Sequence, residues 1–151
     1  MKSTVEIFSE LGNRLSNFGA DDRSRSAIVR AVAENDWFTP EDIHYAVEAL
    51  REELLDGEKI ANWLSHYPHA LSQIPKRVAI IMAGNVPLVG FFDLMCVLAS
   101  GDIPCVKPSS KDRVLEGYVE QLLLEIEPEL NIERYEEGAD YDAVIATGGE
   151  S

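Results

Sequence analysis

One run of apolar residues, ended by a glycine and an asparagine, constrains the fold of this chain more than any other feature. The run Arg77-Val-Ala-Ile-Ile-Met-Ala leads into Gly84-Asn85, and a second apolar segment begins at Pro87. Such a run is typical of a strand covered on both faces, as in a parallel α/β sheet. Gly84 allows a tight turn, and Pro87 suits the first turn of a helix. Because ligands of open α/β sheets bind at the carboxyl ends of strands, Asn85 is a candidate binding residue.

The residues on either side of this run differ in pattern. Residues 1–75 predict a helical segment, with helices over 24–33 and 59–66 and a third that starts at Pro40, after the N-cap Thr39, and stops at Gly57. Residues 76–151 predict strands at 78–82, 103–107, 131–135 and 143–146. Between them we expect one helix over 87–100, ended by Gly101, and another capped by Ser109 or Ser110.

This order of elements predicts an α/β fold with a mainly parallel, nucleotide-binding sheet in residues 76–151. The chain ends at Ser151, just after a strand-end pair of glycines, where such a sheet would continue with a helix. We therefore expect a partial sheet that a longer chain or a second chain completes.

Composition excludes several classes of partner. The formal net charge of −14 argues against nucleic acid and anionic membrane surfaces, since both require clustered Lys and Arg. There is no apolar run of 18 residues and no signal-peptide core, so we expect no membrane span and a cytoplasmic location. Cys96 and Cys105 lie in apolar surroundings without metal-type spacing, which predicts core thiols and no metal site.

Three segments at strand ends each allow two interpretations. Asn85 could cap a helix ahead of Pro87, or its amide could donate to a developing oxyanion. The segment Lys107-Pro-Ser-Ser-Lys suits phosphate or ribose hydroxyls, or is a capping serine between solvated lysines. The segment Thr147-Gly148-Gly149 allows close approach of a diphosphate, or is a plain turn.

In order and spacing, Ile81-Met-Ala-Gly-Asn-Val-Pro-Leu, Val106-Lys-Pro-Ser-Ser and Ile145-Ala-Thr-Gly-Gly resemble the cofactor-binding half of the aldehyde dehydrogenase superfamily. The motif Ala83-Gly-Asn-Val-Pro-Leu-Val-Gly, followed by Ser109-Ser-Lys-Asp, is most similar to the acyl-CoA reductase branch of this superfamily. That branch includes the fatty-acid reductase of bacterial luminescence. These motifs cover about 70 residues. The front half, with Trp37-Phe-Thr-Pro-Glu, resembles the same branch less specifically.

The resemblance implies NADPH-dependent reduction of an acyl thioester such as acyl-CoA to an aldehyde, through a cysteine acyl-enzyme. By motif match, Asn85 would stabilise the oxyanion, and Met82, Ala83 and Gly84 would run beside the nicotinamide. Lys107, Ser109 and Ser110 would contact the adenine-side ribose or its phosphate, and Thr147, Gly148 and Gly149 the diphosphate.

Two departures from the superfamily pattern bear on the cofactor. Ser110 stands where many members have a glutamate that would repel a 2′-phosphate, which favours NADPH over NADH. Gly149 stands where serine is frequent, so one diphosphate hydrogen bond would be missing.

The nucleophilic cysteine of the family lies downstream, and neither Cys96 nor Cys105 matches its motif. We therefore expect no turnover of acyl-CoA by these 151 residues alone. The alternatives are a non-catalytic nucleotide-binding or interaction module and part of an aldehyde-oxidising dehydrogenase. A homo-oligomer is expected by analogy with the superfamily.

Overall fold

Four capped helices form the first half of the chain in the computed structural model, which describes residues 1–67 and 74–146. They are α1 (Thr4–Leu15), α2 (Asp22–Glu34), α3 (Pro40–Glu53) and α4 (Gly57–Ser65). Each begins where a side chain accepts a hydrogen bond from the backbone of its first turn; these N-caps are Ser3, Asp21, Thr39 and Asp56. The expected helical segment is therefore present, with one helix, α1, that the sequence patterns had not delimited.

A parallel sheet with two crossover helices forms the second half. Its elements are β1 (Arg77–Ile81), α5 (Phe91–Ala99), β2 (Ile103–Lys107), α6 (Arg113–Ile126), β3 (Glu133–Arg134) and β4 (Ala143–Ala146). The strand order is β3-β2-β1-β4, and all three pairings are parallel. Within the described residues the fold is thus α/β, with six helices and a four-stranded parallel sheet, and the predicted α/β class with a mainly parallel sheet is confirmed.

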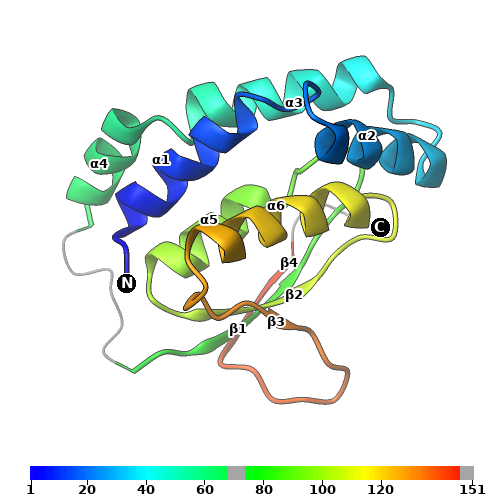
Figure 1. Ribbon diagram of the computed structural model, residues 1–151. Coiled ribbons are helices and arrows are strands. Elements are labelled where there is room, and N and C mark those ends of the chain that lie inside the picture. The colour runs from blue at the N-terminus through cyan, green and yellow to red at the C-terminus, as the bar shows by residue number, and fades with distance from the viewer. Residues whose placement is uncertain (68–73, 147–151) are drawn as a thin grey trace.

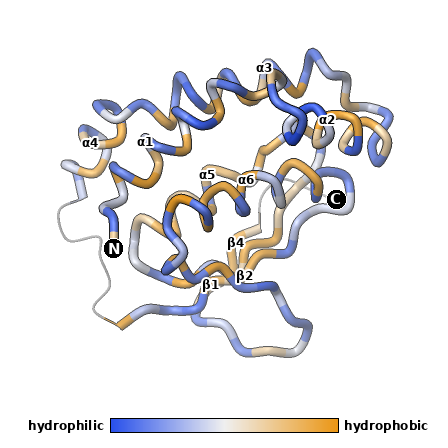
Figure 2. The backbone as a smooth tube through the Cα atoms, viewed as in Figure 1, coloured by the Kyte–Doolittle hydropathy of each residue, from blue (hydrophilic) through white to orange (hydrophobic). Residues whose placement is uncertain are grey.

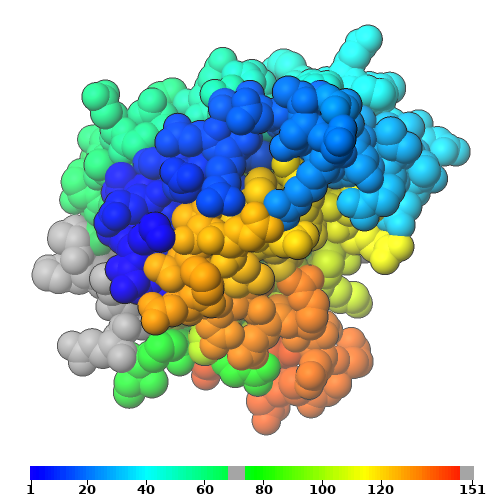
Figure 3. Space-filling model, in the orientation of Figure 1, coloured from blue at the N-terminus to red at the C-terminus, as the bar shows by residue number. Residues whose placement is uncertain are grey.

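The elements stack in layers, with α5 and α6 between the sheet and the N-terminal helices (Figure 1). Val78, Ile80 and Val106 face this middle layer and belong to the hydrophobic core. The Phe8 ring of α1 meets the Phe91 ring of α5 edge to face, with centroids 6.1 Å apart. Figure 3 shows the atoms of the N-terminal helices abutting those of α6. One hydrophobic core therefore extends from the sheet into the helical segment.

The segment that links β3 to β4 crosses part of the other face of the sheet, on which Val144 of β4 remains 64% exposed. No helix forms in this crossover, residues 135–142, and Figure 2 shows it to be mainly polar. The Tyr135 and Tyr141 rings stack at 5.4 Å, and the Arg77 guanidinium lies 5.1 Å from the Tyr141 ring. Arg77 also pairs with Glu133 at 3.0 Å. These polar and aromatic side chains shield the small residues beneath them, and Ala79 and Cys105 are fully buried.

Three expected helix boundaries are wrong, and each has a local cause. Gly57 does not end α3, because Asp56 caps a new helix that begins at Gly57. Pro87 does not begin a helix, since it lies in a turn and α5 starts only at Phe91. Neither Ser109 nor Ser110 caps α6, whose N-cap position is Asp112. The glycine stop at Gly101 is confirmed, with a φ of 80° just after α5.

Among residues 1–67 and 74–146, no helix has the length and apolar character needed to cross a membrane.

Candidate functional site

The loops that leave β1 and β2 start side by side at the carboxyl edge of the sheet. Ile81 is in register with Lys107, and the Met82 N–H donates to the Lys107 carbonyl at 3.0 Å. We call residues 82–90 the β1 loop and residues 108–112 the β2 loop. Two of the three motif segments therefore meet at the edge where ligands of parallel sheets bind.

Gly84 lets the two loops touch. A Cβ built on Gly84 would lie 2.7 Å from the Ser109 Cβ and 3.0 Å from the Lys111 Cβ, closer than carbon atoms pack. Ser109 itself is buried, and its hydroxyl accepts a hydrogen bond from the Lys111 N–H at 3.1 Å. The absence of a side chain at Gly84 thus allows the β1 loop and the β2 loop to be in contact.

The β1 loop contains a turn with an unusual backbone. Its closing hydrogen bond runs from the Val89 N–H to the Val86 carbonyl at 3.2 Å, with Pro87 second and Leu88 third in the turn. Leu88 has a φ of 60°, in the left-handed region. Positive φ at the third residue, after proline, is the type II pattern, which normally takes glycine. For leucine this conformation costs roughly 1–2 kcal/mol.

Asp112 of the β2 loop supports this turn. Its Oδ2 accepts a hydrogen bond from the Leu88 N–H at 2.6 Å, and both residues are buried. Burial raises the pKa of Asp112 to about 7, against the smaller opposing effect of the Leu88 hydrogen bond. The sequence patterns pointed to neither residue; an aspartate directly before a helix is ordinarily taken for its cap.

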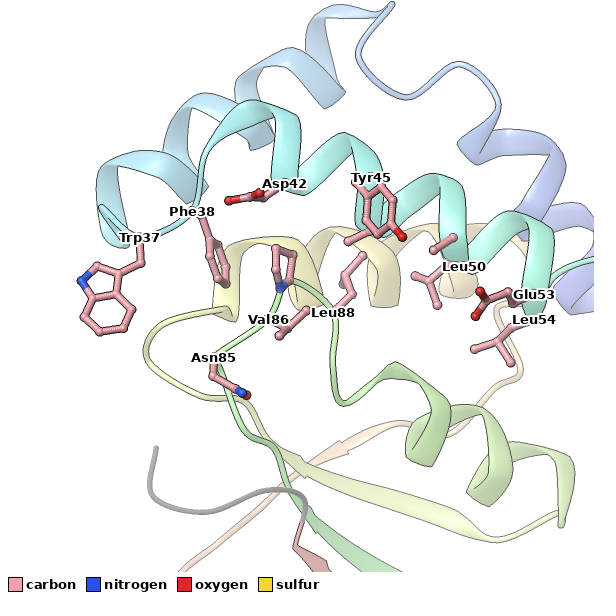
Figure 4. A pocket seen from close by; sticks show the side chains of 13 residues that line it. Trp37, Phe38, Asp42, Tyr45, Leu50, Glu53, Leu54, Asn85, Val86 and Leu88 are labelled. Carbon is pink, nitrogen blue, oxygen red and sulfur yellow. The ribbon is translucent and has the colours of Figure 1, made fainter.

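Asn85 lies at the tip of the β1 loop with an exposed side chain. The helix-cap interpretation is wrong, because the N-cap position of α5 is Gly90, with no side-chain cap. Asn85 instead lines a groove of about 410 Å³ between the β1 loop and α3 (Figure 4). Asn85 is therefore an exposed residue of the groove and not the cap of a helix.

The groove beside Asn85 is mainly apolar. Its walls include Leu50 of α3, Leu54 directly after α3, and Val86 of the β1 loop. Trp37 and Tyr45, at the same groove, are 88% and 79% exposed, which is high for aromatic side chains. A surface of this kind suits the alkyl part of a ligand.

Lys107 is exposed at the end of β2, on the other face of the sheet from α5 and α6. Its Nζ lies 5.7 Å from the centre of the Tyr135 ring. Asn85 and Lys107 therefore share the carboxyl edge but have different neighbours, α3 for Asn85 and the segment after β3 for Lys107.

The remaining candidates differ in exposure. Met82 and Ala83 are buried, whereas Ser110 is exposed. Thr147, Gly148 and Gly149 lie outside the described residues.

Three carboxylates form a buried row that begins at the N-cap of α6 and continues along the helix. Asp112, Glu116 and Glu120 are spaced four residues apart, and each has one buried oxygen without a hydrogen-bond partner in the described part of the chain. Burial raises the pKa of Glu116 to about 7, opposed by the positive charge of Arg134. Arg134 also pairs with Glu120. The sequence could have indicated this row, because its acidic residues lie at helical spacing among the apolar residues of α6, which predicts that they are buried.

The buried acids predict that stability falls as pH rises from about 5 to 8. The folded pKa of Asp112 and that of Glu116, both about 7, exceed the unfolded values of 3.8 and 4.5. The folded state therefore binds more protons in this window, and raising the pH favours unfolding. We expect Glu116→Gln to stabilise the chain by about 1–3 kcal/mol at pH 8 and to change little at pH 5.

Urea unfolding at both pH values measures this effect. Glu125→Gln is the matched control, because Glu125 lies on the same helix and its hydrogen bond to Arg23 lowers its pKa. The control is expected to bring no gain at pH 8. A Glu116→Gln variant that is no more stable at pH 8 than at pH 5, relative to the parent chain, would contradict the account of the buried row.

Neither cysteine has the properties of a nucleophile. Burial raises the pKa of Cys96 to about 11, and the nearby Asp93 carboxylate acts in the same direction. Burial also raises the pKa of Cys105, which is fully enclosed in β2. Because the thiolate is the reactive form, these shifts disfavour nucleophilic reactions of both thiols in the folded chain. No group of three potential metal ligands occurs among residues 1–67 and 74–146.

Comparison with known proteins adds no relative to this description. A scan against models of protein families gave no match. Searches among curated proteins and among solved structures also gave none. The case for a function therefore depends on the motifs and on the geometry of the carboxyl edge.

Proposed function

We propose that this chain is the N-terminal part of an NADPH-dependent acyl-CoA reductase of the aldehyde dehydrogenase superfamily. The observation that carries the proposal is the contact between the β1 loop and the β2 loop at the carboxyl edge of parallel strands. These loops hold two of the three motif segments on which the resemblance depends. A dinucleotide bound across adjacent parallel strands requires such an edge.

The proposed roles follow the chemistry of each exposed group. The Asn85 amide would donate a hydrogen bond to the oxygen of a thioester as negative charge develops there. Lys107 would hold the ribose phosphate of the cofactor, with the Ser110 hydroxyl as a neutral neighbour. NADPH, when bound, supplies the hydride. Asn85, Lys107 and Ser110 are all exposed, so each is accessible to a bound ligand.

An acyl substrate is supported by the groove beside Asn85. Its apolar walls would take an alkyl chain out of water while the thioester carbonyl lies near the amide. The acyl-transfer step of such a reductase needs a thiolate, and neither Cys96 nor Cys105 meets that requirement. We therefore assign to this chain the cofactor and oxyanion side of the reaction.

Calorimetric titration with NADPH and NADH tests the proposal. We expect NADPH to bind more tightly, and Lys107→Ala to weaken NADPH binding by roughly ten- to a hundredfold, because a charge-assisted contact to phosphate contributes roughly 1.5–3 kcal/mol. The affinity for NADH should change much less, because NADH has no 2′-phosphate.

Lys76→Ala is the matched control. Lys76 is also exposed, but it lies at the opposite, amino-terminal edge of the sheet, directly before β1. This variant should bind NADPH like the parent chain. Equal affinity for both cofactors, or equal losses in the two variants, would contradict the proposed site.

A further inference from the structure

The aspartate at the start of α6 is used differently from the other capping residues. At α1 to α4 the N-cap side chain accepts a hydrogen bond from the backbone N–H three residues further along its own helix. Asp112 occupies the same position in α6 but makes no such bond. Its Oδ2 accepts instead from the Leu88 N–H, 24 residues earlier in the chain. Asp112, although aspartate is a common N-cap residue, thus forms its hydrogen bond with the β1 loop and not with its own helix.

The bonded N–H belongs to the peptide group that decides the type of the turn. Type I and type II turns differ mainly in the orientation of the peptide between their second and third residues, here Pro87 and Leu88. The type I form would give Leu88 a negative φ, which leucine prefers. The observed φ of 60° requires the opposite orientation, and that orientation directs the Leu88 N–H to Asp112.

Burial reinforces the arrangement. The Leu88 side chain is 4% exposed, so leucine is retained for packing at a position where its backbone favours another conformation. The second oxygen of Asp112 is buried without a partner, and desolvation of the carboxylate opposes its ionisation. The positive φ of Leu88 and the burial of the Asp112 carboxylate are both unfavourable, and one short hydrogen bond joins these two residues.

We propose that Asp112 is a positioning residue that holds the Pro87–Leu88 peptide in its type II orientation and thereby fixes Asn85 at the carboxyl edge. Asn85 directly precedes the turn, so reversal of this peptide would change the path of the backbone beside it. The contribution of this hydrogen bond to ligand binding rests on the proposed function. The effect of Asp112 on the conformation of the turn does not depend on the proposed function.

The strength of the hydrogen bond should depend on the charge of Asp112. An ionised carboxylate is a stronger acceptor than a neutral acid. The groups that act on Asp112 are the Leu88 N–H from the β1 loop and the Glu116 carboxylate, one turn along α6. Between pH 5 and 8 the Leu88 amide signal should therefore shift as Asp112 ionises.

Nuclear magnetic resonance of the 151-residue chain without any ligand tests the proposal. We expect a strong nuclear Overhauser effect between the Pro87 Hα and the Leu88 N–H, as type II turns give, and a Leu88 amide shift with a midpoint near pH 7. Asp112→Ala should lose the strong effect. Asp112→Asn should keep it, because an amide oxygen still accepts, but should lose the titration.

Two further variants separate the effect of the Asp112–Leu88 hydrogen bond from general effects on folding. Glu116→Gln removes the neighbouring buried acid, and should keep both the turn and the titration of Leu88. Leu88→Gly combined with Asp112→Ala should restore the turn, because glycine adopts positive φ without strain. A strong Pro87–Leu88 effect that persists in Asp112→Ala, or a titration that persists in Asp112→Asn, would overturn the proposal.

Cofactor titration then distinguishes this inference from the proposed function. If NADPH binds, Asp112→Ala should bind it more weakly and the double variant should recover affinity. If NADPH does not bind the parent chain while the turn responds as described, the proposed function fails and the positioning role stands. If NADPH binds the parent chain and Asp112→Ala equally well, Asp112 does not position the site.

Discussion

Phe91→Ala is expected to lower the free energy of unfolding by about 3–5 kcal/mol, as removal of a buried phenylalanine ring generally does. Phe91 is fully buried, and its ring meets that of Phe8 across the interface between α5 and α1. Domains of this size are stable by only about 5–15 kcal/mol, so the variant should be near its unfolding limit. Denaturant titration followed by circular dichroism measures the loss.

The neighbouring Phe92→Ala variant is the control. Phe92 lies on the same helix but is 46% exposed, and its main aromatic contact is Trp63, at 6.0 Å. We expect a loss of about 1 kcal/mol or less, because little buried area disappears. Equal losses for Phe91 and Phe92 would show that the Phe8–Phe91 contact is not part of the core.

The same titration tests whether the helical segment and the sheet unfold together. Both tryptophans, Trp37 and Trp63, lie in the helical segment, and both cysteines, Cys96 and Cys105, lie in residues 76–146. Tryptophan fluorescence and thiol reactivity therefore report on different parts of the chain. A shared core predicts coincident transitions in the parent chain. Two separate transitions would mean that the segments fold independently.

Gly84→Ala is expected to destabilise the chain by about 1–3 kcal/mol and to weaken NADPH binding, because overpacking at this point separates the loops. The added methyl group would collide with Ser109 and approach Lys111. Thermal unfolding and cofactor titration measure the two effects. Combining Gly84→Ala with Ser109→Gly removes the nearest side chain and should recover part of both losses.

Gly117→Ala provides the matched glycine control. Gly117 lies within α6, and a Cβ added there would meet nothing within 4 Å. Alanine should stabilise the helix by about 0.5–1 kcal/mol through its higher helix propensity. If Gly84→Ala were as well tolerated as Gly117→Ala, the close contact of the two loops would not exist in solution.

The elements that local chemistry specifies could be predicted from the sequence. The uninterrupted apolar runs of β1 and β2 indicate strands buried on both faces, and the alternation with helices then leads to a parallel sheet. The start of α3 follows from Thr39 and Pro40 in the same way, and the glycine after α5 marks its end. Each of these features depends on residues within a few positions of one another.

The features missed from the sequence depend on contacts between distant residues. Leu88 adopts a glycine-like turn because its N–H meets Asp112 and its side chain has a buried site, and neither cause is visible near position 88. For the same reason Pro87 was expected to begin a helix. The segment between β3 and β4 spans the sheet without a helix, held by Tyr135, Tyr141 and Arg77 from separate parts of the chain.

The most direct test of the central claim, a dinucleotide site where the β1 and β2 loops meet, is a resonance-by-resonance map of NADPH binding to the isotopically labelled chain. The account predicts that the largest shift changes occur in residues 82–90 and 107–112, with the Asn85 side-chain amide among them. Absence of binding at millimolar NADPH, or changes confined to residues away from the carboxyl edge of the sheet, would contradict it.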